Sequence, residues 1–297
     1  MVQNKFHGLG IAVITPFRAD GSIDEEALIR LLEYQIRSGA DFLCIMGTTA
    51  ETPTLTADEK RWLKDFFVER VAGRVPLLMG CGGNCTAAVI DELQHTDWRG
   101  IDGVLSVCPM YNKPSQEGLY QHFKAIAQAS PVPVVLYNVP GRTGVNMTAA
   151  TTLRLARDFD NIVAIKEASG NITQMDDIIK QKPDGFDVIS GDDGITFPLI
   201  TLGAVGVISV IGNALPREFS RMVRLALNGD YPSALRIHHK FAELFKLLFV
   251  DGNPAGVKAM LHAMGMIENQ LRLPLVPTRL TTMEQISDIL HELDIKY

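Results

Sequence analysis

The chain has 297 residues, of which 46% are hydrophobic and 21% are charged, and its formal net charge at pH 7 is −6. This composition is typical of a globular protein and excludes disordered, collagen-like and disulfide-scaffold classes. Basic residues form no cluster, so we expect neither a nucleic acid nor a membrane surface as a partner. We also expect a cytoplasmic protein, because no apolar stretch could span a bilayer and the first residues lack a signal-peptide pattern.

Strand patterns alternate with helix patterns from residue 9 to residue 212. Short runs rich in Val, Ile and Leu recur at the spacing of βα units, and their nearly continuous hydrophobicity is typical of parallel strands buried on both faces. Capping-box patterns at Ser22 to Glu25 and at Thr56 to Glu59 predict the starts of two intervening helices. The eight predicted strands span residues 9–15, 42–47, 76–80, 103–109, 132–139, 162–168, 186–190 and 206–212.

After the last predicted strand only helical patterns remain, over residues 217–228, 231–250, 254–265 and 282–294. Eight βα units without a linker favour a closed barrel over an open sheet, and no G-x-G-x-x-G pattern follows the first strand. We therefore predict an α/β fold, a (β/α)8 TIM barrel with a C-terminal helical extension. Residues 1–228 would form the catalytic barrel, and residues 229–297 the extension packed on it.

Four cysteines, Cys44, Cys81, Cys85 and Cys108, lie in apolar segments. We expect them to be small core residues in a reducing compartment. The spacing of Cys81 and Cys85 leaves a metal or disulfide pair open as an alternative.

Lys166 is the most informative polar residue, because it follows an unbroken apolar strand run at the end where barrel sites form. Burial disfavours an ammonium, and a neutral amine is a nucleophile that forms a Schiff base with a carbonyl carbon. An ion pair of Lys166 with Glu167 or Asp192 is the alternative. Lys258 is a weaker candidate, since we expect it on an amphipathic helix with its amine in solvent.

Hydroxyl groups near other strand ends could relay the protons that Schiff-base chemistry requires. Tyr137, Tyr111 and Thr48 are the candidates. Taken singly, such a residue is more often a core aromatic or a loop-capping hydroxyl, but their coincidence with a strand-end lysine favours the relay. Thr48 and Thr49 follow a glycine and could present N–H groups to a carboxylate. Arg142 could bind a second carboxylate, or be a solvated surface arginine.

Two competing chemistries are disfavoured. A zinc-dependent aldolase needs converging histidines, and none of the seven histidines ends a predicted core strand. A phosphosugar enzyme binds phosphate after the last two strands, where Asp192 and Asp193 would repel it.

Longer motifs carry a resemblance along essentially the whole chain: GTTAETPTL (47–55), YNKPSQEGLYQHF (111–123), YNVPGRTG (137–144), IKEASGN (165–171), SGDD (190–193) and GVISV (206–210). In this order they resemble the pyruvate-dependent class I aldolase family, which includes the N-acetylneuraminate lyases. YNVPGRTG is similar to the branch that condenses pyruvate with L-aspartate 4-semialdehyde on the route to diaminopimelate and lysine. The resemblance thus implies a lyase-type enzyme of amino-acid biosynthesis.

The resemblance also implies residue roles. Lys166 would form an imine with pyruvate, while Tyr137, Thr48 and Tyr111 would relay protons, with Tyr111 reaching the neighbouring subunit's site. Thr48 and Thr49 would hold the pyruvate carboxylate. Arg142 would bind the carboxylate of the aldehyde. Gly191 and Ile208 would shape the pocket around the lysine.

The family further implies a reaction without a metal or organic cofactor, and a homotetramer built as a dimer of tight dimers. Lysine-sensitive relatives bind lysine in a crevice at the dimer interface. At the matching positions this chain has Ala57, Lys60, Ala88 and Met110, with only Asn84 kept. We expect lysine to inhibit weakly or not at all, because Lys60 adds a cation and Ala88 lacks a carboxylate.

Two alternatives remain open. One is another pyruvate-dependent aldolase, acting on N-acetylneuraminate or a 2-keto-3-deoxy sugar acid, to which Arg142 is poorly suited. The other is a non-catalytic paralogue that retains the barrel for ligand binding or assembly.

Overall fold

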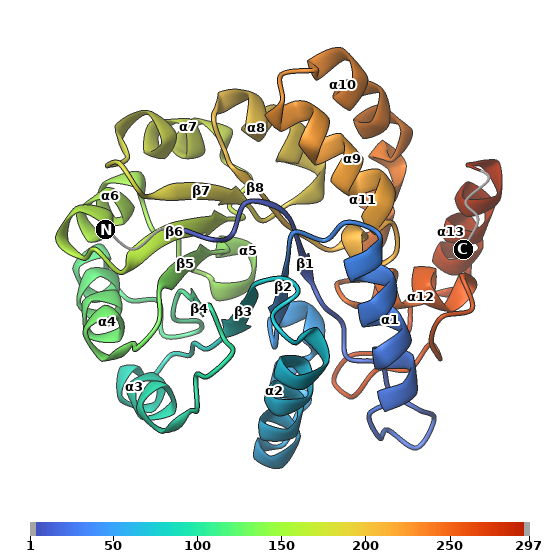
Figure 1. Ribbon diagram of the computed structural model, residues 1–297, viewed down its shortest axis with the longest axis horizontal. Coiled ribbons are helices and arrows are strands. Elements are labelled where there is room, and N and C mark those ends of the chain that lie inside the picture. Colours follow the sequence, from blue (N-terminus) through green and yellow to red (C-terminus); the bar gives the residue numbers. More distant parts are fainter. Residues whose placement is uncertain (1–3, 294–297) are drawn as a thin grey trace.

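A closed barrel of eight parallel strands lies at the centre of the computed structural model, which describes residues 4–293 (Figure 1). Each strand pairs with the next, and β1 pairs with β8 to close the barrel. This arrangement confirms the predicted fold class. The strands are β1 (Gly8–Ala12), β2 (Phe42–Ile45), β3 (Leu77–Gly80), β4 (Gly103–Val107), β5 (Val134–Asn138), β6 (Ile162–Glu167), β7 (Asp187–Ser190) and β8 (Gly206–Ser209).

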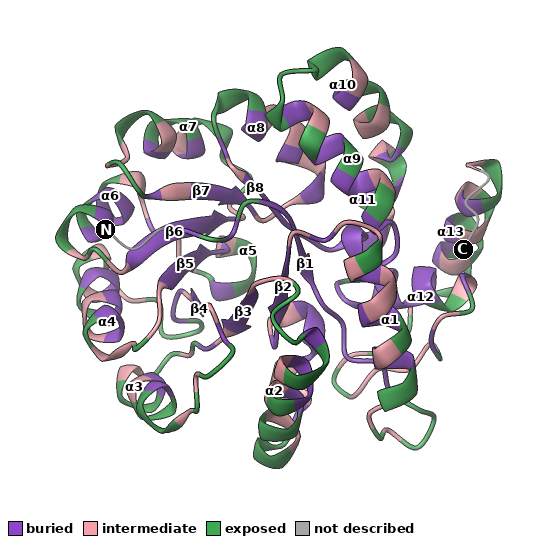
Figure 2. Cartoon of the chain, viewed as in Figure 1, coloured by how far each residue is buried: buried purple, intermediate pink, exposed green. Residues whose placement is uncertain are grey.

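Helices surround the barrel, each with one face buried against the strands and one face exposed, whereas the strands are buried along nearly their whole length (Figure 2). Four short 3-10 helices lie at the carboxyl ends of strands: η1 (Thr48–Ala50), η2 (Thr52–Thr54), η3 (Asp193–Ile195) and η4 (Ile211–Asn213). The surrounding helices are α1 (Glu25–Arg37), α2 (Ala57–Val71), α3 (Thr86–His95), α4 (Gln116–Ala129), α5 (Pro140–Thr143), α6 (Ala149–Asp158), α7 (Ile172–Gln181), α8 (Thr196–Leu202) and α9 (Pro216–Leu227).

Local caps set where the first two helices begin. The predicted capping box at Thr56 and Glu59 is confirmed, because each side chain bonds the other's backbone N–H. The one predicted at Ser22 is wrong. Asp24 caps α1 by accepting a hydrogen bond from the backbone N–H of Ala27 at 3.1 Å. Asp24 is the stronger cap because it lies directly before the first helical turn.

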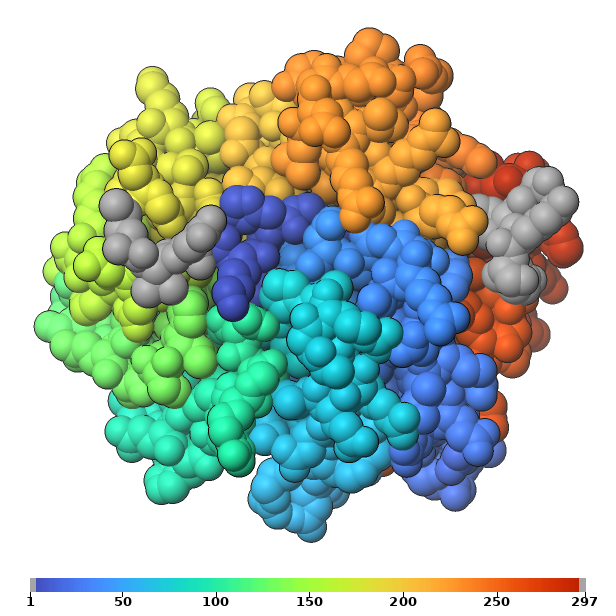
Figure 3. Space-filling model, viewed as in Figure 1, coloured from blue at the N-terminus to red at the C-terminus, as the bar shows by residue number. Residues whose placement is uncertain are grey.

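The C-terminal residues form α10 (Tyr231–Lys240), α11 (Ala242–Val250), α12 (Ala255–Ala263) and α13 (Leu280–Glu292). The single helix predicted over residues 231–250 is wrong, since Phe241 separates α10 from α11. The predicted helix end at residue 294 lies outside the described residues. Helices α12 and α13 lie at one side of the barrel (Figure 1). The start of the described chain covers the middle of the face seen in Figure 3.

The core has an inner and an outer part. Inside the barrel, apolar side chains from successive strands pack together, and Phe6 packs edge-on against Phe42 with ring centroids 5.4 Å apart. The outer part lies between strands and helices. In residues 4–293, no helix combines the length and apolar character needed to cross a bilayer.

The four thiols are free rather than paired in a disulfide. Cys44, Cys81 and Cys108 are buried, as predicted. The expectation of a core position is wrong for Cys85, which is exposed at the N-cap of α3.

Candidate active site

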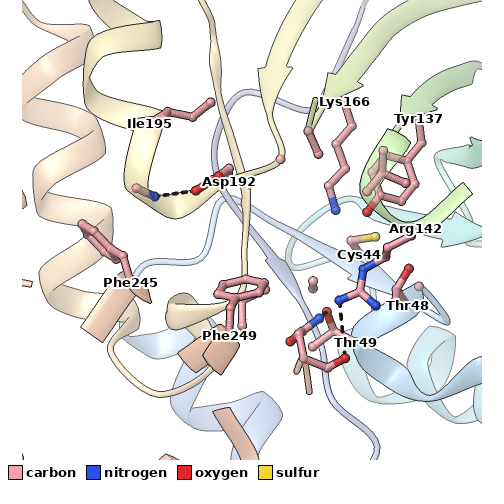
Figure 4. A pocket seen from close by; sticks show the side chains of 18 of the residues that line it. Cys44, Thr48, Thr49, Tyr137, Arg142, Lys166, Asp192, Ile195, Phe245 and Phe249 are labelled. Carbon is pink, nitrogen blue, oxygen red and sulfur yellow. Dashed lines mark hydrogen bonds between the residues drawn. The ribbon is translucent and has the colours of Figure 1, made fainter. Parts of the chain in front are cut away.

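The register of the sheet places Lys166 beside Tyr137. In the β5–β6 pair Tyr137 lies opposite Lys166, and Asn138 lies opposite Glu167. Because side chains alternate along a strand, Tyr137 and Lys166 project into the barrel while Asn138 and Glu167 project toward the helices. The Lys166 Nζ lies 4.4 Å from the centroid of the Tyr137 ring, and only 7% of Lys166 is exposed (Figure 4).

Glu167 does not pair with the lysine next to it. Its buried carboxylate accepts hydrogen bonds from Asn138 Nδ2, Gln174 Nε2 (3.0 Å) and the backbone N–H of Ser169 (2.8 Å). Burial raises the pKa of Glu167, and these donors oppose that effect. The lysine ion pairs of the described residues involve Lys5, Lys64, Lys182 and Lys258. Neither ion pair considered for Lys166 is therefore present, and its amine is available to react.

The Thr48–Thr49 turn lies across the cavity from Lys166 and is held by the C-terminal extension. Asn253 Nδ2 donates to Thr49 Oγ1 at 3.0 Å, and Arg142 Nη2 donates to the backbone oxygen of Asn253 at 3.5 Å (Figure 4). The sequence analysis missed Asn253, because it lies about 200 residues from Thr49 in a segment without a strand pattern.

A buried ion pair lies directly behind this turn. Glu51, in the left-handed region with φ 55°, accepts from Lys258 Nζ and, at 3.0 Å, from the backbone N–H of Arg272. Both side chains of the ion pair are fully buried, and Lys258 also donates to the backbone oxygen of Gln270 at 3.0 Å. Burial lowers the pKa of Lys258, while the Glu51 carboxylate acts in the opposite direction. The expectation of a solvated Lys258 is wrong, because its helix packs against the barrel rather than on the surface.

Six of the eight predicted site residues line one cavity of about 510 Å³ at the mouth of the barrel: Thr48, Thr49, Tyr137, Arg142, Lys166 and Gly191. Gly191 approaches the lysine so closely that a Cβ there would lie 3.0 Å from Lys166 Cε. Cys44 also lines the cavity, and burial raises its pKa to about 11, against the effect of the Lys166 cation. Its thiol is therefore neutral near pH 7, and a neutral thiol is a poor nucleophile.

The other two predicted residues do not line this cavity. Ile208 is a buried residue of β8. Tyr111 is 88% exposed, with a backbone φ of 72° that is uncommon for a residue other than glycine. Its side chain projects from the surface, so it cannot serve the cavity of its own chain.

The two aspartates after β7 differ in their surroundings. Asp193 is buried and accepts from the backbone N–H groups of Val210 (3.0 Å) and Ile211 (2.8 Å). Burial raises the pKa of Asp193 to about 6. The expectation that both carboxylates face a ligand is wrong for Asp193, which holds the loop after β8 instead. Asp192 lines the cavity.

A second cavity of about 480 Å³ shares Thr48, Tyr137 and Arg142 with the first. Lys60, Asn84 and Met110 line it, whereas Ala57 and Ala88 are not among its lining residues. Glu92, one helical turn beyond Ala88, adds a carboxylate that the sequence analysis did not consider. No cluster of three or more residues suited to hold a metal ion occurs in residues 4–293.

The chain is similar to known proteins along its length. The sequence pattern of the Dihydrodipicolinate synthetase family matches residues 5–293. The chain is 71% identical to the 4-hydroxy-tetrahydrodipicolinate synthase of Phocaeicola vulgatus and 67% identical to that of Parabacteroides distasonis, over 100% of each chain. It is also similar to the crystal structure of dihydrodipicolinate synthase from Thermotoga maritima, with 42% identity, a TM-score of 0.95, and coverage of 97% of this chain and 99% of that one.

Proposed function

This chain belongs to the dihydrodipicolinate synthetase family, and from that premise we propose how its own residues perform the reaction. The chain is an enzyme that condenses pyruvate with L-aspartate 4-semialdehyde to 4-hydroxy-tetrahydrodipicolinate, in the biosynthesis of diaminopimelate and lysine. The roles of individual residues are our proposal. The observation that carries it is the unpaired amine of Lys166 beside Tyr137 in a cavity that also contains Arg142.

In the first step, the neutral amine of Lys166 attacks the keto carbon of pyruvate, and loss of water forms the imine. The hydroxyl of Tyr137 lies on the neighbouring strand and would pass protons to and from the departing oxygen, together with Thr48. Thr48 and Thr49 would bind the pyruvate carboxylate through their hydroxyl and backbone N–H groups. The hydrogen bond from Asn253 fixes the orientation of the Thr49 hydroxyl for this task.

In the second step, the imine loses a methyl proton to become an enamine, whose carbon attacks the aldehyde. Arg142 lies on α5 at the cavity wall and would orient the carboxylate of the aldehyde. Gly191 and Ile208 would shape the cavity around the lysine. The amine of the aldehyde then attacks the imine carbon, which closes the ring and releases Lys166. The imine itself withdraws electrons, so we propose that no metal or organic cofactor takes part.

We further propose that the enzyme is a cytoplasmic homotetramer, a dimer of tight dimers. The exposed, conformationally strained Tyr111 supports this, because in a tight dimer it could enter the neighbouring cavity and complete the proton relay. Barrel residues 1–228 would form the catalytic unit, and the extension from residue 229 would supply Asn253 to the site.

Trapping the imine tests the proposal. Borohydride added with pyruvate should reduce the adduct and leave a stable pyruvyl group on Lys166, located by mass spectrometry of peptides. Lys166→Ala should abolish both the adduct and the turnover of L-aspartate 4-semialdehyde. Lys246→Ala is the matched control, because Lys246 lines the same cavity but is exposed, and it should retain the adduct. A correctly folded Lys166→Ala enzyme with unchanged turnover would refute the mechanism. In a separate assay, the unsubstituted enzyme should not cleave N-acetylneuraminate.

A further inference from the structure

Asp192 is the only carboxylate among the described residues that line the main cavity. Its Oδ1 accepts a hydrogen bond from the backbone N–H of Gly194 at 2.8 Å, which fixes the side chain (Figure 4). In the described part of the chain, Oδ2 has no hydrogen-bond donor and the carboxylate has no ion-pair partner. One oxygen is thus used to position the side chain, and the other is free to bind a ligand.

The surrounding charges favour a cation at this position. Asp193, the next residue, is a second carboxylate, and repulsion from Asp192 contributes to its raised pKa. The positive groups that line the cavity are Lys166, Arg142 and Lys246. Lys166 is used to form the imine, and in the described residues no ion pair joins Arg142 or Lys246 to Asp192. A ligand ammonium beside Asp192 would neutralise this charge and regain a charge-assisted hydrogen bond.

The proposed function supplies such a ligand. L-aspartate 4-semialdehyde carries a carboxylate and an ammonium on the same carbon, and Arg142 can bind only the carboxylate. We propose that Asp192 binds the ammonium of the aldehyde substrate and thereby makes the site specific for amino aldehydes. This inference rests on the proposed function and adds a specificity-determining residue to it. Asp192 and Arg142 would together recognise both charged groups and orient the aldehyde carbon toward the enamine.

Succinate semialdehyde provides the test, because it has the same aldehyde and carboxylate but no ammonium. Two constants are measured at saturating pyruvate, for the unsubstituted enzyme and for Asp192→Asn. They are the KM for L-aspartate 4-semialdehyde and the inhibition constant of succinate semialdehyde. Asparagine keeps an oxygen that can accept from Gly194, removes the charge, and replaces Oδ2 by an NH2 group that cannot accept from an ammonium. Asp192→Ser is a second variant that retains a capping oxygen. Asp176→Asn, at an exposed position on α7, controls for the change of one net charge.

We expect Asp192→Asn to raise the KM for the amino aldehyde roughly 10- to 100-fold, the effect of losing a hydrogen bond to a charged group. The inhibition constant of succinate semialdehyde and the KM for pyruvate should change less than about twofold, because neither molecule has an ammonium. Equal losses for both aldehydes, or no loss for either, would overturn this inference alone. An unsubstituted enzyme that fails to condense L-aspartate 4-semialdehyde would overturn the proposed function, and this inference with it.

Discussion

Replacing Lys258 by methionine removes one half of the buried ion pair and leaves Glu51 charged inside the protein. The remaining partner of Glu51 is the backbone N–H of Arg272, a single hydrogen bond that cannot replace an ammonium. Breaking a buried pair in this way typically costs about 3–5 kcal/mol of unfolding free energy. Methionine fills a similar volume, so the cost measures the charge rather than a cavity.

For a chain of 297 residues, a loss of about 3–5 kcal/mol corresponds to a fall in the thermal midpoint of roughly 5–8 °C. Thermal and urea unfolding should be compared at one protein concentration, because association contributes to the stability of an oligomer. The double variant Glu51→Gln with Lys258→Met removes both charges and keeps an acceptor for Arg272. It should be more stable than the sum of the two single losses predicts, by about 2–3 kcal/mol.

The pair also holds the turn that carries Thr49, so Lys258→Met should raise the KM for pyruvate more than the KM for the aldehyde. The exposed Lys246→Met is the stability control and should change the unfolding free energy by less than about 0.5 kcal/mol. The reasoning is refuted if Lys258→Met costs less than about 1 kcal/mol and the double variant shows no coupling.

Three further outcomes are expected. Arg142→Lys keeps the positive charge but loses the forked guanidinium donor, so kcat/KM for the aldehyde should fall roughly 10- to 100-fold. The KM for pyruvate should change little. A similar loss for both substrates would contradict the role proposed for Arg142. The Arg272 guanidinium lowers the pKa of Glu59 to about 2, so this carboxylate stabilises the fold above its ordinary pKa near 4.5 and ceases to do so as the pH falls toward 2. Glu59→Gln should therefore cost roughly 1–2 kcal/mol at pH 7, and the difference from the unsubstituted protein should shrink in urea unfolding between pH 5 and pH 2. Finally, excess free lysine should leave most of the condensation rate unchanged, because Lys60 repels the amino groups of the ligand. Strong inhibition at a modest lysine concentration would contradict this expectation. In that case Glu92→Gln should weaken the inhibition.

The fold could be predicted because hydrophobic periodicity is a local property. Eight apolar runs such as residues 132–139 and 162–168 each specify a buried strand, and the absence of a linker between them favours one barrel. The end of each strand then marks Lys166, Tyr137 and Thr48 as neighbours in space, since all eight strands run parallel. Local cues were less reliable at helix ends, where Asp24 rather than Ser22 caps α1.

The contacts of the C-terminal extension could not be predicted from the sequence. Lys258 has the pattern of a surface lysine, and only the packing of α12 against the barrel buries it beside Glu51, 207 residues away. Asn253 reaches Thr49 for the same reason. The path of one loop decides which of two adjacent aspartates lines the cavity, since it places Asp192 there and Asp193 in the core. Strand periodicity and strand-end chemistry thus determined the fold and the lysine that we propose as the nucleophile. Only tertiary packing decided which distant charges meet, because burial and ion pairing depend on neighbours that the local sequence does not specify.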